Sequence, residues 1–204
     1  MIEPLGGWAN AWPLAVGFLI AYLIGAIPFG LILARISGAG DIRKIGSGNI
    51  GATNVLRTGR KGVAAATLLL DVGKGFLAVW LAWRCGGPDM AVLAAYGALL
   101  GHCFPIWLKF KGGKGVATYV GILFALNIYL GLIFIASWLI TFSIFKFSSL
   151  ASLVASISIP VYLLIITQFD QVFFFTIMFV LIFFTHKENI KRLKNKEETK
   201  TKIY

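Results

Sequence analysis

Long apolar runs separated by short polar segments dominate the chain. Three of these runs, at 12–36, 116–145 and 150–167, contain almost no charged residue. A helix needs roughly 20 apolar residues to cross the hydrocarbon core of a bilayer, which is about 30 Å thick. A membrane β-barrel would instead show strands of roughly ten residues with alternating polarity. The pattern therefore predicts an all-α fold, a polytopic integral membrane helix bundle.

Seven helices are expected along this chain. They lie at 12–36, 62–84, 90–108, 115–126, 128–146, 149–168 and 171–186. The run at 116–145 has two interpretations, one tilted helix or two short helices hinged near Asn127. A single helix of that length would measure about 45 Å, which exceeds the thickness of the core.

The basic residues favour the two short helices. They gather at 35–61, 109–114 and 187–202, and the positive-inside rule places all such clusters on the cytoplasmic face. Six crossings after the first cluster satisfy this rule, whereas five would put the tail outside. We therefore expect seven transmembrane helices, with the N-terminus outside and the C-terminus in the cytoplasm. A fourth helix this short crosses only if its glycine-rich start enters the membrane or the bilayer thins.

Composition narrows the class of protein. The net charge of +11 comes from residues that flank apolar runs, so it indicates topology rather than a nucleic-acid partner. Cys85 and Cys103 make neither a disulfide framework nor a metal spacing, and we expect no metal and no cofactor. The sequence predicts one domain over 1–204, in which 196–204 form a solvated, disordered tail.

Candidate chemistry begins in the first polar loop, which reads GAGDIRKIGSGNIGATNVLRTGRKG at 38–62. Glycines let consecutive N–H groups face one anion, and short polar side chains and arginine add donors suited to phosphate. A flexible loop that only carries positive charge is the alternative. The candidate phosphate-binding residues are Lys44, Gly46, Ser47, Gly48, Asn49, Thr53, Asn54 and Arg57.

A second loop, GHCFPIWLKFKGGKGVAT at 101–118, repeats this theme. Lys109, Gly112, Gly113 and Lys114 immediately precede a predicted helix, and the free N–H groups of a helix N-terminus favour anions. Simple lysine anchoring at the membrane surface is the alternative. The loop lacks the GxxxxGK[ST] pattern, so ATP hydrolysis is not expected.

A third segment, THKENIKRL at 185–193, follows the last apolar run. His186 and Asn189 are three residues apart, so on a helix they share one face. A histidine that titrates near neutrality is a candidate for the reacting centre. A basic flank that stops membrane transfer is the alternative.

Asp71, Lys74 and His102 are ionisable residues in the interior of predicted spans. Asp71 and Lys74 are three residues apart and form either an intrahelical pair or part of an active cavity. His102, in the next span, is either a structural histidine or a base.

The segments GSGNIGATNVLR at 46–57, 101–118 and HKENIKRL at 186–193 resemble the PlsY family of bacterial acyl-phosphate:glycerol-3-phosphate acyltransferases, and the likeness runs over nearly the whole chain. The resemblance implies a seven-helix membrane enzyme that converts glycerol 3-phosphate to 1-acyl-glycerol 3-phosphate (lysophosphatidic acid) and phosphate, the first committed step of phospholipid synthesis. It also implies acyl phosphate as the donor. The HxxxxD motif of acyl-CoA-dependent enzymes is absent, because Trp107 follows His102 and Lys191 follows His186 at that spacing.

The expected reaction is direct attack by the 1-hydroxyl on the mixed anhydride. Ser47, Asn49, Asn54, Arg57 and Lys114 would hold phosphates, while His186 and Asn189 orient the hydroxyl. Ser47 as a covalent nucleophile is the alternative, although no His–Asp relay is visible. The expected partners are both substrates, membrane lipid, and the enzymes that form acyl phosphate and acylate lysophosphatidate. A transporter or channel for an anionic phosphorylated metabolite and a membrane assembly factor are the competing functions.

Overall fold

The computed structural model describes residues 11–201, and every regular element in that range is helical. The predicted all-α class is therefore confirmed for this part of the chain. The residues form two compact units: residues up to Gly113 with Ala117–Leu126 make the first, and Lys114–Val116 with the residues from Asn127 onward make the second.

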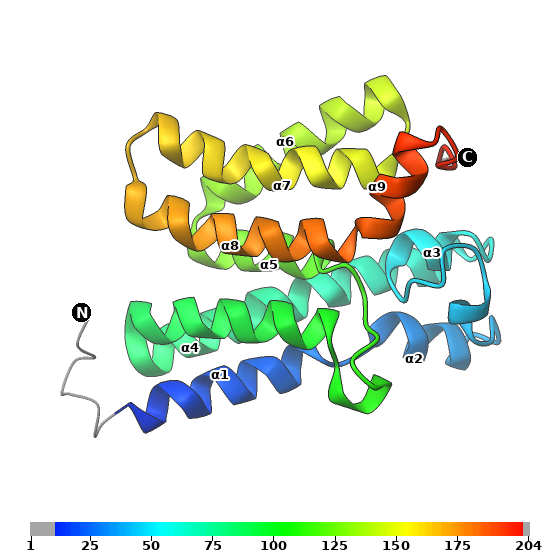
Figure 1. Ribbon diagram of the computed structural model, residues 1–204. Coiled ribbons are helices and arrows are strands. Elements are labelled where there is room, and N and C mark those ends of the chain that lie inside the picture. The colour runs from blue at the N-terminus through cyan, green and yellow to red at the C-terminus, as the bar shows by residue number, and fades with distance from the viewer. Residues whose placement is uncertain (1–10, 202–204) are drawn as a thin grey trace. The chain divides into compact units, whose positions relative to one another are not determined.

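The first unit contains the helices of the N-terminal half (Figure 1). They are α1 (Trp12–Gly25), α2 (Phe29–Ile36), η2 (Ile42–Lys44), α3 (Ala52–Leu56), α4 (Lys61–Cys103), η3 (Ile106–Leu108) and nearly all of α5 (Val116–Leu126). The second unit contains α6 (Ile128–Phe145), α7 (Ser148–Ile165), α8 (Phe169–Thr185) and α9 (Lys187–Lys194).

The helix predicted over 12–36 is interrupted, because α1 ends at Gly25 and α2 begins at Phe29. Pro28 has no N–H group and cannot continue the helical ladder. Two carbonyl oxygens at the break are capped by side chains that come from later in the chain. Trp107 Nε1 donates to Ala26 O and Lys74 Nζ donates to Ile27 O, each at 2.8 Å. Such capping is what allows a helix to break inside a membrane.

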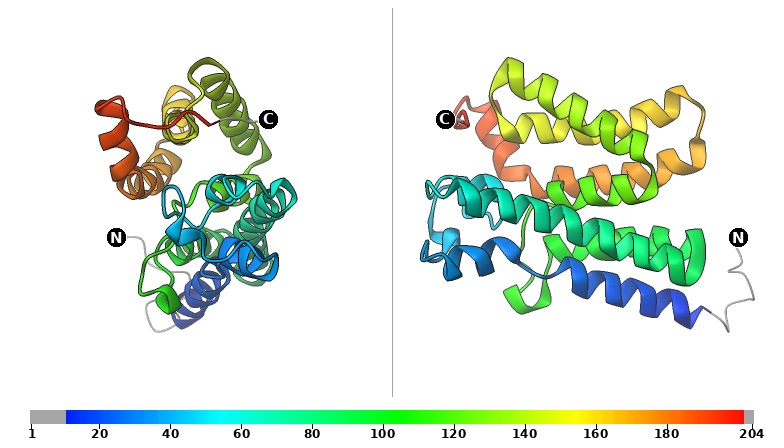
Figure 2. Two further views of the ribbon diagram at one scale, coloured as in Figure 1. Left: turned by 90° about the vertical axis from the view of Figure 1, so that its right-hand side faces the viewer. Right: turned by 180° about the vertical axis from the view of Figure 1, so that it is seen from behind.

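The two helices predicted at 62–84 and 90–108 correspond to α4, which contains a sharp break. Gly86 and Gly87 leave the helical conformation, Gly87 with φ of +71°, and the chain turns back there (Figures 1 and 2). The second half of α4 ends at Cys103, earlier than predicted. Pro105 follows two residues later and restricts the chain to a short 3-10 turn.

Glycines let the helices of the first unit approach at backbone distance. A Cβ on Gly25 would lie 2.1 Å from Ala98 O, and one on Gly101 would lie 2.1 Å from Tyr22 O. A Cβ on Gly121 of α5 would lie 1.9 Å from Val72 O. These are small-residue crossings of the kind that hold membrane helices together.

In the second unit, Asn127 separates α5 from α6. Its backbone is extended, with φ of −160° and ψ of 119°, and its side chain accepts a hydrogen bond from Tyr129 N. The run at 116–145 therefore forms two helices. Four segments of residues 11–201 are long and apolar enough to span a bilayer, and the pair α8 and α9, bent by 65°, makes a fifth.

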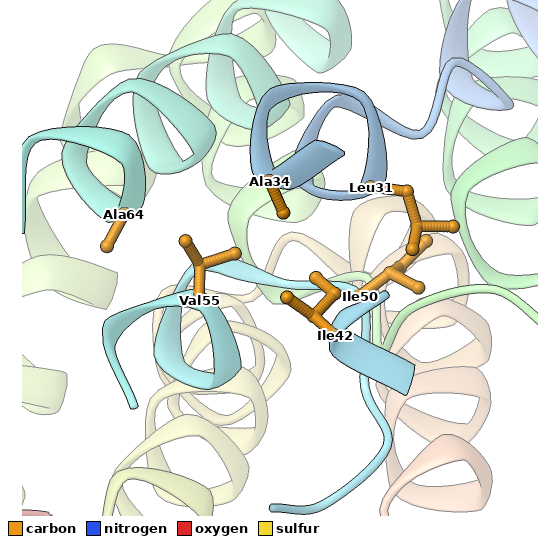
Figure 3. Close-up of a cluster of buried hydrophobic side chains, with 6 residues drawn as sticks. All are labelled: Leu31, Ala34, Ile42, Ile50, Val55 and Ala64. Atoms are coloured by element: carbon orange, nitrogen blue, oxygen red, sulfur yellow. The ribbon is translucent and has the colours of Figure 1, made fainter. Parts of the chain in front are cut away.

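A small apolar core supports the first polar loop (Figure 3). Ile42, Ile50 and Val55 from the loop are at most 4% exposed and pack with residues of α2 and α4. The remaining members of this cluster are Leu31, Ala34 and Ala64. The glycine-rich loop is therefore anchored to helices at several points along its length.

Candidate functional site

Asn54 organises the first polar loop from within. Its side chain is 1% exposed, and Nδ2 lies 2.8 Å from Ile42 O, 3.1 Å from Ile45 O and 2.8 Å from Asn49 O. Its Oδ1 accepts a hydrogen bond from Ser47 N at 3.2 Å. The side chain is thus bonded to the main chain of the loop, which differs from the predicted direct contact with phosphate.

Arg57 lies against the glycine turn of this loop. Gly46 and Gly48 have φ of +55° and +69°, a region that favours glycine. A Cβ on Gly46 would lie 2.5 Å from Arg57 Nη1 and 2.6 Å from Asn54 Oδ1. A side chain at Gly46 would therefore displace Arg57 or the buried Asn54 amide, in addition to straining a backbone conformation that favours glycine.

The polar side chains at the surface of this loop can serve an anion. Lys44, Ser47, Thr53 and Arg57 are exposed, and Asn49 is half-buried. The hydroxyl groups, the ammonium and the guanidinium are all donors to phosphate.

Arg43 is engaged by a carboxylate of the same loop. It pairs with Asp41 at 2.6 Å, and its hydrogen bonds hold the pKa of that carboxyl well below its ordinary value. The guanidinium of Arg43 is thus already partnered.

The second loop uses its predicted backbone donors internally. Gly112 N donates to Cys103 O and Gly113 N donates to His102 O, both at 3.0 Å. A Cβ on Gly113 would lie 2.1 Å from His102 Nε2. These glycines therefore allow a close return of the chain onto the end of α4, and their N–H groups do not face an anion as expected. Lys109 is exposed, with φ of +53°.

In the second unit, Lys114 and Asn189 form the centre of a polar cluster. Lys114 Nζ donates to Asn189 Oδ1, and Asn189 is 4% exposed. Asn189 Nδ2 in turn donates to Glu198 Oε1 at 2.6 Å. The carboxylate of Glu198 also accepts from Ser149 Oγ and from Arg192 Nε, each at 2.7 Å.

Glu198 shows that this cluster suits an anion. Burial alone would raise its pKa, but the hydrogen bonds from Ser149, Arg192 and Asn189 outweigh burial and lower the pKa below its ordinary value. The sequence did not identify Ser149 or Glu198. No spacing links them to the predicted site, because Ser149 lies 49 residues before Glu198. The sequence also led us to expect a solvated tail there, whereas residues 196–201 carry defined hydrogen bonds. The rest of that predicted tail, 202–204, lies outside the described residues.

His186 lies at the junction of α8 and α9 and is 2% exposed. Its Nδ1 lies 2.8 Å from Ile182 O, so Nδ1 carries the proton and donates. Burial first, and the charge of Lys114 second, lower the pKa of His186 to about 4. The ring is neutral at pH 7, contrary to the predicted titration near neutrality, and its Nε2 can accept a hydrogen bond.

The ionisable residues of α4 form a structural network. Lys74 Nζ lies 2.7 Å from Asp71 Oδ1, and both side chains are 3% exposed. This confirms the intrahelical pair, to which the bond from Lys74 to Ile27 O is added. His102 Nδ1 lies 3.8 Å from Asp71 Oδ1. Within residues 11–201, no three His, Cys, Asp or Glu side chains gather as a metal site requires.

The predicted site residues thus belong to two sets, each described within its own unit. The first unit holds Lys44, Gly46, Ser47, Gly48, Asn49, Thr53, Asn54, Arg57, Lys109, Gly112 and Gly113. The second unit holds Lys114, His186 and Asn189.

Comparison with known proteins identifies one family. Residues 15–196 match the family model described as glycerol-3-phosphate acyltransferase. The glycerol-3-phosphate acyltransferase of Pelagibacter ubique (strain HTCC1062) is 63% identical over 186 residues, which cover 91% of this chain and 96% of that protein.

Two crystal structures of PlsY, an integral membrane glycerol 3-phosphate acyltransferase, share the fold. The glycerol 3-phosphate form has a TM-score of 0.86 and 35% identity, and the lysophosphatidic acid form has a TM-score of 0.85 and 34% identity. Each match covers 92% of this chain and 95% of the other.

Proposed function

Because the chain belongs to the glycerol-3-phosphate acyltransferase family, we propose that it transfers a fatty acyl group from acyl phosphate to the 1-hydroxyl of glycerol 3-phosphate. The products are 1-acyl-glycerol 3-phosphate and phosphate, which makes this the first committed step of phospholipid synthesis. The names of its relatives support the acceptor, and the lysophosphatidic acid form of PlsY supports the product. The three sequence segments that resemble the PlsY family, together with the absence of HxxxxD, support the donor.

The observation that carries this proposal is the carboxylate held by the second-unit cluster. Asn189 and Arg192 hold an anion there, and the ammonium of Lys114 is bonded to the same amide. Both substrates bring phosphate groups, and two such charges require several cations to stay close together. Lys114 and Arg192 provide such cations within this cluster.

In the proposed reaction, the hydroxyl oxygen attacks the acyl carbonyl. The bond from the carbonyl carbon to the phosphate oxygen breaks, and the leaving phosphate takes both the electron pair and the proton of the hydroxyl. Neutral His186 accepts the hydrogen bond of the hydroxyl through Nε2 and orients it, which needs no change in its protonation. Lys114 stabilises the negative charge that develops, and Asn189 holds its ammonium in place.

The first loop serves the phosphate groups in this proposal. Lys44, Ser47, Asn49, Thr53 and Arg57 donate to them, and Lys109 adds charge. Asn54 shapes this loop through its main-chain bonds, and the glycines allow the turns. Ser47 acts as a hydrogen-bond donor in this reaction and forms no acyl-enzyme.

The chain is a multi-pass membrane protein, with four to five apolar spans in residues 11–201 and a similar fold in integral membrane PlsY. We propose seven spans, formed by α1 with α2, the two halves of α4, α5, α6, α7 and α8. The basic clusters support an outer N-terminus, a cytoplasmic C-terminus and a cytoplasmic active site in the inner membrane. Of these seven spans, α5 is the shortest, with 11 residues, and it crosses only if its glycine-rich start enters the membrane or the bilayer thins. Both units serve as one acyltransferase domain between the enzymes that supply acyl phosphate and those that acylate the product.

Phosphate release by the purified protein in lipid tests this function. We expect release only with both glycerol 3-phosphate and palmitoyl phosphate, and none with palmitoyl-CoA. Arg57→Ala and Lys114→Ala should each lower turnover at least a hundredfold, equivalent to about 2.7 kcal/mol. Arg84→Ala, on the exposed surface of α4, is the matched charge control and should keep wild-type activity.

Three results would contradict parts of this proposal. Activity with palmitoyl-CoA would overturn the donor, and wild-type rates in Arg57→Ala or Lys114→Ala would overturn the site. If the folded protein releases no phosphate with any donor, the proposed enzyme activity is wrong, and uptake of phosphorylated solutes is the function to test next.

A further inference from the structure

The chain folds back on itself after α9. Lys196 has φ of +60°, and Glu197 N donates to Arg192 O at 2.8 Å. Thr201 N donates to Lys146 O, in the α6–α7 connection, at 2.9 Å. Figure 2 (left) shows this tail leaving α9 and crossing toward α6 and α7. The tail is therefore attached at both ends, with Glu198 between the two attachment points.

Glu198 is the tail residue that enters the Lys114–Asn189 cluster. Its side chain is 9% exposed, and its two oxygens accept hydrogen bonds from Ser149, Asn189 and Arg192 at 2.6 to 2.7 Å. A hydroxyl, an amide and a guanidinium around one anion form the donor set that also binds a phosphate oxygen.

A phosphate and the Glu198 carboxylate cannot both take the hydrogens of Ser149 Oγ and Arg192 Nε. The Ser149 hydroxyl has one hydrogen to donate, and Arg192 Nε has one. A phosphate that took these donors would lie within several ångströms of a second negative charge, and the two would repel each other. A phosphate can therefore take these two donors only if the Glu198 carboxylate leaves them.

Few contacts hold the described tail residues beyond Asn195, so the tail can detach. Beyond Asn195 the described tail residues form no helix. Their contacts with the α6–α7 end of the unit include the bonds of Glu198 to Ser149 and of Thr201 N to Lys146 O, and Lys200 Nζ lies 6.0 Å from the centre of the Phe147 ring. Because the carboxylate is tethered a few residues from its site, it rebinds at a high effective concentration.

We propose that the C-terminal tail regulates this site, with Glu198 acting as a built-in competitor that must withdraw before a phosphate group can bind. This inference rests on the proposed function, because it assigns phosphate to the same donors. A site that is open for only a tenth of the time binds its ligand about tenfold more weakly than an open site. Removal of the carboxylate should recover that factor.

Direct binding of inorganic phosphate tests the competitor. The purified full-length protein in lipid nanodiscs is titrated with phosphate by calorimetry, as wild type, Glu198→Gln and Glu198→Ala. We expect both variants to lower the Kd for phosphate by about tenfold. The matched control is Glu197→Gln, which removes the same charge from the exposed neighbouring residue and should leave the Kd unchanged. A chain ending at Asn195 provides a second way to remove the competitor, and it should behave as Glu198→Ala does.

An unchanged or higher Kd in both Glu198 variants and in the shortened chain would overturn the inference. A higher value would mean that Glu198 supports Asn189 and Arg192 rather than competing for them. Phosphate titration requires no turnover, so the two proposals fail separately. If the Glu198 variants bind phosphate more tightly but no form of the protein transfers an acyl group, the proposed function is wrong and the role of Glu198 as a competitor stands. If acyl transfer is normal and the Kd is unchanged, the proposed function stands and the competitor role is wrong.

Discussion

Lys74 links the break between α1 and α2 to the first half of α4. Its ammonium lies 2.7 Å from Asp71 Oδ1 and donates to Ile27 O at 2.8 Å. Lys74→Met keeps the length of the side chain but removes the charge and the donor. The substitution therefore leaves a buried carboxylate unpaired and a carbonyl oxygen uncapped.

The two losses have different sizes. Removing one partner of a buried ion pair costs about 3–5 kcal/mol, and leaving one buried carbonyl oxygen unsatisfied costs about 1–3 kcal/mol. Lys74→Met should therefore lower the free energy of unfolding by about 4 kcal/mol or more. Adding Asp71→Asn removes the buried charge, so the double variant should lose only the carbonyl contribution of about 1–3 kcal/mol. The double variant should thus be more stable than the single one.

Reversible unfolding of the detergent-solubilised protein in sodium dodecyl sulfate, followed by circular dichroism, measures these differences. Gly73→Ala is the control, because it changes an exposed position next to Lys74 where a Cβ meets nothing within 4 Å. It should be neutral or stabilise by up to about 1 kcal/mol. The reasoning is refuted if Lys74→Met unfolds like the wild type, or if Asp71→Asn fails to restore stability to it.

Three further predictions concern the loop, the histidine and the helix crossing. Asn54→Ala should cost about 1–3 kcal/mol of stability and raise the KM for glycerol 3-phosphate more than it lowers kcat, and an unaltered KM would contradict its role in shaping the loop. The folded-state pKa of His186 is lowered from 6.5 to about 4, so the unfolded chain binds the extra proton between these values. The stability that neutral His186 contributes is thus complete above pH 6.5 and is lost as the pH falls toward 4, by up to about 3 kcal/mol. The free energy of unfolding, measured at pH 7 and at pH 4.5, should show this loss in the wild type and a smaller loss in His186→Asn. Gly121→Ala should destabilise the fold by about 1–3 kcal/mol, because its Cβ would lie 1.9 Å from Val72 O. The control is Gly62→Ala, at a position where a Cβ meets nothing within 4 Å, and it should not destabilise the fold in the same unfolding assay.

Hydropathy predicted most helices because continuous apolar sequence has few alternatives in a bilayer. The break at Asn127 was predicted from the length of the run together with the positions of the basic clusters, and the extended backbone confirms it. The break before Pro28 was not predicted, because membrane helices often tolerate a proline. Its capping donors, Lys74 and Trp107, lie 47 and 81 residues away from the carbonyls they bind. Such separations leave no periodic signal.

The sequence identified the polar loops but could not assign a partner to each donor. An asparagine amide or a glycine N–H can serve an anion or the main chain equally well. The tertiary structure bonds Asn54 to its own loop, and it bonds Gly112 and Gly113 to the end of α4. The predicted solvated tail illustrates the same limit, because only the position of Ser149 and Asn189 gives Glu198 its site.

The effect of losing a polar side chain in this fold therefore depends on whether it bonds to buried main-chain groups or lies exposed. Lys74 and Trp107 donate to backbone oxygens that a break has released, so their loss acts on the folded state even when the ligand is absent. Arg57 is exposed beside a glycine turn. Its loss removes charge where we propose that a phosphate binds, but it leaves no buried group unpaired. Variants of the first kind should lower the free energy of unfolding and reduce activity only as folded protein is lost. Variants of the second kind should lower turnover at an unchanged free energy of unfolding.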